Sequence, residues 1–280
     1  MTTTTITSEQ IAEFASYLRR EEKSEGTIEK YGRYAKAFAE FAGGLPMTKE
    51  LAVDWKQSIA EKYTAAGANG MLSAVNSFLH YLGYAELKLS KLKIQRRIFV
   101  APERELKRSD FEMLISTAER IGKIRLSLIM QTILATGIRV GELQFITVEA
   151  ARSGQAAIQF KGKARIIFIP TKLCELLLAY ARGRKIDSGS VFVTKRGMPV
   201  DRHVIWQGMK KLSATSGVLA GKIFPHNLRR LFARTYYASY QNLVELADIM
   251  GHSDVNTTRI YTATTGSELR KRLDALNLVP

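Results

Sequence analysis

Three short segments of this chain hold side chains that can act on a phosphodiester. They are ATGIRVGEL with Arg139, PHNLRRLFA with His226 and Arg229, and MGHSDVNTTRIYT with His252 and Tyr261. Breaking a phosphodiester requires cations for its oxygens, an attacking group, and proton transfer at the attacking and leaving oxygens. Arginine, tyrosine and histidine can fill these roles in turn. The segments therefore predict a metal-free phosphoryl-transfer site with a tyrosine nucleophile.

The spacing within the segments supports a shared phosphate site. His226 and Arg229 are three residues apart, which places both side chains on one face of a helix. Arginine suits a phosphate because its planar fork donates two parallel hydrogen bonds and keeps its charge near neutrality. Arg139 follows Gly137, where we expect a helix to break. Taken alone, Arg139 would more simply form a surface ion pair with Glu142, three residues on.

Together these strings resemble the tyrosine recombinase (phage integrase) family, and the architecture is similar to its simple, Xer-like members. The resemblance implies that Tyr261 attacks the phosphorus and forms a 3′-phosphotyrosyl bond, which stores the energy of the broken phosphodiester. It implies that Arg139 and Arg229 clamp the scissile phosphate. It also implies that His226 accepts the phenol proton and that His252 donates a hydrogen bond to the phosphate.

The resemblance also supplies a general acid for the leaving 5′ oxygen. The family places a lysine in a β-hairpin, and FKGKARIIFIP offers Lys161, with Lys163 as the rival. Glu142 is then expected to support Arg139 from behind.

We expect no metal and no cofactor, because the chain has one cysteine, no zinc-ligand spacing and no GxxxxGK[ST] phosphate loop.

The composition indicates a polyanionic partner. The 280 residues carry a formal charge of +16, and 46% of them are hydrophobic, enough for a substantial core. Residues 98–280 hold 28 Lys and Arg against 15 Asp and Glu, whereas residues 1–97 hold 14 against 11. No apolar run is long enough to span a bilayer, no signal peptide is evident, and Cys174 has no partner for an intrachain disulfide. We expect a cytoplasmic, nucleoid-associated protein that binds DNA.

The periodicity predicts a mainly α-helical protein with a small antiparallel β-sheet. We expect a helical, DNA-binding N-terminal domain at 1–90, a basic linker at 91–105 and a mixed α/β catalytic domain at 106–280. Apolar spacing predicts helices near 8–18, 27–41, 49–62 and 66–82, and another that starts at 109–112 and ends near Gly137. Strands are expected at 156–160, 165–169 and 190–194.

We expect the two domains to close around double-stranded DNA as a clamp. The candidate DNA contacts are cationic and polar residues of the second helix and of the linker: Thr27, Lys30, Tyr31, Arg33, Lys36, Lys93, Arg96 and Arg97. Their alternative interpretation is a solvated charged surface.

The family resemblance further implies strand exchange through a Holliday junction, in a homotetramer on short inverted-repeat core sites. No arm-type DNA-binding domain is expected before the helical domain. The accessory partners, the choice between dimer resolution and mobile-element integration, and docking of the C-terminal tail in cis or in trans all stay open. Two alternatives are a non-cutting DNA-binding protein of the same fold, which would not explain six filled chemical positions, and a monomeric type IB topoisomerase.

Overall fold

The structure, a computed structural model, describes residues 6–94, 105–160, 163–252, 254–259, 270, 271 and 273–277. The chain divides into two compact units, Met1–Arg96 and Arg97–Pro280. Most of the expected linker, residues 95–104, lies outside the described residues. In the part of the chain that the structure describes, no helix is long and apolar enough to cross a membrane.

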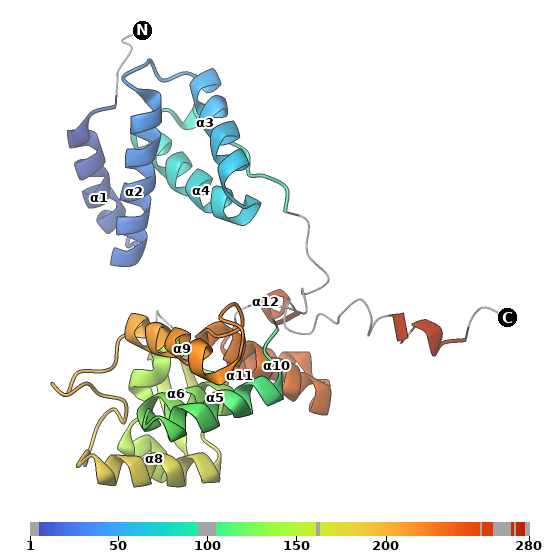
Figure 1. Ribbon diagram of the computed structural model, residues 1–280. Coiled ribbons are helices and arrows are strands. Elements are labelled where there is room, and N and C mark those ends of the chain that lie inside the picture. The colour runs from blue at the N-terminus through green and yellow to red at the C-terminus, as the bar shows by residue number, and fades with distance from the viewer. Residues whose placement is uncertain are drawn as a thin grey trace. The chain divides into compact units, whose positions relative to one another are not determined.

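The first unit is a helical bundle (Figure 1). Its elements are α1 (Ser8–Arg20), α2 (Glu25–Ala42), α3 (Lys49–Lys62), α4 (Ala65–Tyr81) and the short 3₁₀ helix η1 (Ala85–Leu87). Threonines cap three of the helices: the side chains of Thr7, Thr48 and Thr64 accept hydrogen bonds from backbone N–H groups of the first turn. The core is aromatic, with Phe14, Phe38, Trp55 and Phe78 all at most 2% exposed.

Two asparagines of α4 hold the chain that leaves this bundle. Asn76 donates to the Leu89 carbonyl and accepts from the Leu89 N–H, both at 2.8 Å. Asn69 makes the same pair of bonds with Leu92, at 2.9 and 2.7 Å. From α3, the Lys49 ammonium donates to the Lys88 carbonyl. Residues 88–92 are therefore fixed to the first unit, although they belong to no helix or strand.

The second unit is mixed and mainly helical. Its helices are α5 (Arg108–Arg120), α6 (Ile124–Thr136), η3 (Val140–Phe145), α7 (Val148–Ser153), α8 (Thr171–Gly183), α9 (Arg202–Ser216), α10 (Pro225–Tyr240), α11 (Leu243–Met250) and α12 (Val255–Arg259). Strands β1 (Gln155–Phe160) and β2 (Lys163–Phe168) form an antiparallel hairpin. Figure 1 shows α5 and α6 side by side, and α10 packs against both α6 and α11. The expected fold class is confirmed.

Two details of the second unit differ from the sequence prediction. The helical segment before Gly137 is two helices, because Gly122 takes a left-handed backbone (φ +70°) between α5 and α6. The strand expected at 190–194 is wrong: this segment makes only isolated bridges, Thr147 with Ser190 and Val193 with Pro199. Its apolar residues Val191 and Phe192 are buried in the core, so their pattern reflects burial and not an extended ladder.

Candidate active site

The turn after α6 places Arg139. Helix α6 ends at Gly137, whose left-handed φ of +64° favours glycine, and a Cβ at this position would also collide with the ring of Phe232 from α10. The chain then continues into η3, with Arg139 as the residue that precedes it. The backbone of this turn therefore lies directly against α10, which carries His226 and Arg229.

Arg139 is fixed through its backbone N–H and through its guanidinium. Its backbone N–H donates to Glu142 Oε2 at 2.7 Å, its Nη1 donates to Glu142 Oε1 at 3.0 Å, and its Nη2 donates to the Gly251 carbonyl at 3.0 Å. The ion pair with Glu142 that the spacing indicated is present, but it is not a surface pair. Glu142 is 1% exposed, whereas Arg139 keeps 37% of its side chain open to solvent. A buried carboxylate thus holds an arginine side chain that is partly open to solvent.

Glu142 also accepts a second arginine, Arg165 of β2. Arg165 Nη1 donates to Oε1 at 3.0 Å and Nη2 to Oε2 at 2.8 Å. Burial by itself would raise the pKa of Glu142, but the hydrogen bonds and charge of Arg165 and Arg139 outweigh it and hold that pKa below its usual value. The carboxylate is therefore ionised at neutral pH. No local sequence motif marks Arg165 for this role.

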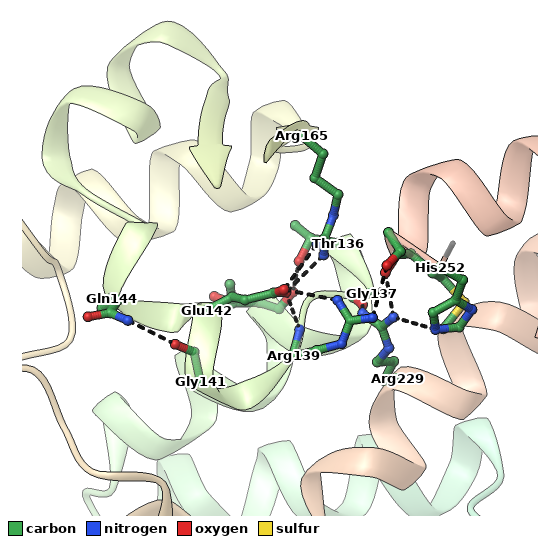
Figure 2. A network of polar contacts seen from close by, with 12 residues as sticks. Thr136, Gly137, Arg139, Gly141, Glu142, Gln144, Arg165, Arg229 and His252 are labelled. Atoms are coloured by element: carbon green, nitrogen blue, oxygen red, sulfur yellow. Dashed lines mark hydrogen bonds and ion pairs between the residues drawn. The ribbon is translucent and has the colours of Figure 1, made fainter. Parts of the chain in front are cut away.

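Arg229 is buried, with 3% of its surface exposed, and it joins two helix ends. Its Nη1 donates to the Gly137 carbonyl after α6, and its Nη2 donates to the Met250 carbonyl of α11 at 2.6 Å. Nη2 also lies 2.9 Å from His252 Nε2 (Figure 2). The two arginines thus contact adjacent carbonyls of one turn, Arg229 at Met250 and Arg139 at Gly251.

The partners of His252 define which of its ring nitrogens carries the proton. Arg229 can only donate, so His252 Nε2 accepts from it. The proton then sits on Nδ1, which lies 2.7 Å from the hydroxyl of Thr258 on α12, a residue with no exposed surface. Thr258 is a partner that the sequence analysis did not identify, although it lies within the motif that carries His252. It fixes the orientation of the imidazole.

His226 lies at the start of α10, three residues before Arg229, and is exposed. Desolvation by the surrounding protein lowers its pKa, and the charges of Arg229 and then Arg230 lower it further. The imidazole is therefore neutral at pH 7, as a proton acceptor must be.

The described structure brings Arg139, Arg229 and His252 into one network, with His226 on the same helix as Arg229. Lys161 and Tyr261 lie outside the described residues, as does the side chain of Lys163. The strands on either side of Lys161 pair as far as Phe160 with Lys163. These predicted roles stay predictions.

The predicted DNA contacts of α2 separate into two groups. Lys30, Arg33 and Lys36 are exposed at three-residue spacing along one side of the helix, with Lys36 Nζ 3.9 Å from Glu40. Thr27 bonds with Ser24 at 2.9 Å, and Tyr31 packs against the core. Lys93 is exposed, and Arg96 and Arg97 lie outside the described residues. We call these three exposed cations the α2 stripe.

Comparison with known proteins adds sequence similarity across the whole chain. The family model described as the phage integrase family matches residues 104–268. Tyrosine recombinase XerA of Pyrococcus furiosus is 28% identical over 284 residues, which cover 98% of this chain and 96% of the relative. Tyrosine recombinase XerD of Vibrio cholerae is 27% identical over 75% of this chain and 74% of the relative.

Solved structures share the fold. The post-cleavage complex of the XerH site-specific recombinase with a palindromic difH substrate has a TM-score of 0.73 and 18% identity, over 97% of this chain and 85% of that chain. A lambda integrase tetramer bound to a Holliday junction has a TM-score of 0.70 and 17% identity, over 90% of this chain and 76% of that chain. At these identities the likeness concerns the fold.

Proposed function

The chain belongs to the phage integrase family and is a site-specific recombinase, and from this premise we propose that it cuts and rejoins DNA through a bond between Tyr261 and a 3′ phosphate. The Tyr261 oxygen bonds to phosphorus as the bond from phosphorus to the 5′ oxygen breaks. His226 takes the phenol proton, and Lys161 gives a proton to the leaving oxygen, with Lys163 as the alternative donor. Attack by a 5′ hydroxyl reverses the step, so rejoining needs neither ATP nor a metal.

The observation that carries this proposal is the convergence of Arg139, Arg229 and His252 from three distant segments. A phosphoryl-transfer transition state carries its charge on the non-bridging oxygens, so removal of one positioned donor costs on the order of a hundredfold in rate. Arg139 is held from behind by Glu142 and is partly open to solvent. Its position suits a group that receives a phosphate from outside.

The two histidines suit different tasks. A tyrosine with a pKa near 10 needs a base, and the lowered pKa of His226 keeps that imidazole neutral. His252 is proposed to donate to the phosphate. Because its Nε2 accepts from Arg229 in the structure, this donation requires a proton on Nε2 in place of that bond, which the other tautomer supplies when the Thr258 hydroxyl donates to Nδ1.

The partner of the chain is DNA. We propose short inverted-repeat core sites, a homotetramer on synapsed DNA, a Holliday-junction intermediate and a location at the nucleoid in the cytoplasm. The exposed cations Lys30, Arg33, Lys36 and Lys93 are proposed to neutralise phosphates. The DNA sites, which the chain does not encode, decide between integration of a mobile element and resolution of dimers.

The test is to trap the covalent complex. Duplexes from the genomic neighbourhood of the gene, nicked near candidate sites, release a short fragment on cleavage and so block rejoining. We expect an adduct that mass spectrometry of the digested complex maps to Tyr261. The variant Tyr261→Phe should bind the same DNA and form no adduct, whereas Tyr240→Phe, which alters an exposed tyrosine of α10, should react like the unaltered chain.

Two results would contradict this function. An adduct that persists in Tyr261→Phe would assign the nucleophile to another residue. Sequence-specific binding without an adduct on any nicked site would instead favour a DNA-binding protein that does not cut.

A further inference from the structure

Arg165 faces inward on strand β2. Along this strand, side chains alternate between the core and the solvent. On β2, Ile167 is 3% exposed, whereas Ile166 and Phe168 are 59% and 76% exposed. Arg165 shares the inner face with Ile167, and only 12% of its side chain is exposed. A buried cation costs free energy unless it is paired and hydrogen-bonded. Arg165 therefore needs a partner within the core, and that partner is Glu142.

The Arg165 guanidinium and the Glu142 carboxylate form a two-point pair. The two bonds measure 3.0 and 2.8 Å, and this parallel geometry fixes direction as well as distance. Arg139 uses the same two oxygens, with its Nη1 on Oε1 and its backbone N–H on Oε2. The carboxylate is thus shared by two arginines, and its position depends on both.

Arg165 also packs against the turn that precedes His252. A Cβ added at Gly251 would lie 2.5 Å from Arg165 Nη1 and 2.7 Å from its Cζ, so the guanidinium lies directly on the backbone of this glycine. The carbonyl of Gly251 accepts from Arg139. Figure 2 shows Arg165 and Arg139 reaching Glu142 from different sides. One guanidinium therefore contacts both supports of Arg139.

The place of Arg165 in the hairpin connects this contact to the general acid. Arg165 pairs with Ile158 across the hairpin and lies two residues after Lys163, the first residue of β2, which pairs with Phe160. A shift of β2 relative to η3 would therefore break the bonds to Glu142. The strand that leads from the proposed acid is attached to the proposed phosphate clamp.

We propose that Arg165 is a positioning residue for DNA cleavage, which holds Arg139 in its phosphate-binding orientation through Glu142 and Gly251. This inference rests on the proposed function, in which Arg139 binds the scissile phosphate. We place Arg165 behind Arg139 and not on the DNA, because only 12% of its side chain is exposed and its Nη atoms point to the buried carboxylate of Glu142. Its loss should leave binding nearly unchanged and slow the chemical step.

The experiment compares single-turnover adduct formation by the unaltered full chain, Arg165→Met and Arg165→Lys on a nicked duplex. Arg165→Met should slow the step by about 10- to 100-fold, as expected for the loss of a residue that orients a catalytic group. Arg165→Lys keeps the charge but not the fork, so it should recover only part of the rate. The control Arg125→Met removes another partly buried arginine, which donates to the Val193 carbonyl, and should not slow the step.

A second substrate separates positioning from a general structural effect. A methylphosphonate at the cleavage site lacks the negative charge that Arg139 neutralises, so a displaced Arg139 matters less there. We expect Arg165→Met to slow adduct formation much less on this substrate than on the phosphate substrate. Equal slowing on both substrates, or equal slowing by Arg125→Met, would overturn the proposal.

Thermal unfolding identifies variants that fail to fold, and Arg165→Lys then provides the comparison. A folded Arg165→Met that forms the adduct at the unaltered rate would overturn the positioning role. If Arg165→Met does not fold, a folded Arg165→Lys with the unaltered rate would overturn it. If the unaltered chain forms no adduct on any site, the proposed function fails first, which distinguishes the two failures.

Discussion

His226 shows how neighbouring charges set the state of a single residue. Desolvation and the charges of Arg229 and Arg230 lower its pKa. We therefore expect an NMR titration midpoint for His226 in the free protein below the ordinary value of about 6.5. The variant Arg230→Gln should raise the midpoint, because one of the cations that oppose protonation is lost. A midpoint at or above 6.5, or no change in Arg230→Gln, would contradict this account.

The same shift affects stability, and its sign follows from proton binding. A histidine whose folded pKa is lowered binds fewer protons in the folded state than in the unfolded chain. Its contribution to the free energy of unfolding is therefore constant above about pH 6.5 and decreases as the pH falls towards the folded pKa. Arg230→Gln should reduce this decrease, which urea unfolding at pH 5.5 and 7.5 would measure.

Individual residues of the site were predictable where a motif carried them. Arg139, Arg229 and His252, identified from short strings, meet in one network. The role of Arg165 was not visible, because its partner Glu142 lies 23 residues away and no local pattern pairs them. The available signal was a charged residue at an inward position of β2, which requires a buried partner. Lys161 and Tyr261 stay predictions.

At the scale of elements, helix α4 determines where the first unit ends. Asn76 satisfies both backbone groups of Leu89, and Asn69 those of Leu92. We expect Asn76→Ala to weaken local closure by about 1–2 kcal/mol, the effect of unsatisfied partly buried groups. The Leu89 amide should then exchange its hydrogen about 5- to 30-fold faster, which hydrogen-exchange NMR measures.

Asn69→Ala is the matched control for this prediction, because it acts on a different amide. It should accelerate exchange at Leu92 and leave Leu89 much less affected. Equal acceleration at both amides in both variants would mean that residues 88–92 open as one unit, and the separate clamps would be wrong.

Elements with a strong helical period were predictable, and short apolar segments were not. Helix α3 spans Lys49–Lys62, as the spacing predicted, because its caps and apolar positions are local features. The segment at 190–194 failed because burial of Val191 and Phe192 in the core produces the same apolar signal as a strand. Only tertiary contacts distinguish the two.

At the scale of the whole molecule, the excess positive charge predicts DNA binding that weakens steeply with salt. Each phosphate that a cation neutralises adds about 0.9 to the slope of log affinity against log salt. The variant Lys30→Gln, Arg33→Gln, Lys36→Gln should therefore reduce the magnitude of this slope by about 1 for each of its cations that contacts a phosphate. Fluorescence anisotropy at several salt concentrations measures it.

A control of equal charge separates contact from overall field. Lys172→Gln, Arg182→Gln, Lys185→Gln removes three exposed cations in and just after α8, which we do not place at the DNA. Its slope should stay near that of the unaltered chain. If both triple variants change the slope equally, the stripe on α2 does not contact the phosphates.

The partners of Arg229 have a consequence for how the molecule attracts an anion. Its guanidinium donates to carbonyls at the C-terminal ends of two helices, Gly137 after α6 and Met250 of α11. A helix C-terminus carries a partial charge of about −0.5, spread over its last free carbonyls. Such dipoles stabilise a buried cation. Unlike a mobile counterion, they are part of the backbone and cannot dissociate from it. The positive potential of Arg229 is thereby built into the fold before any DNA arrives.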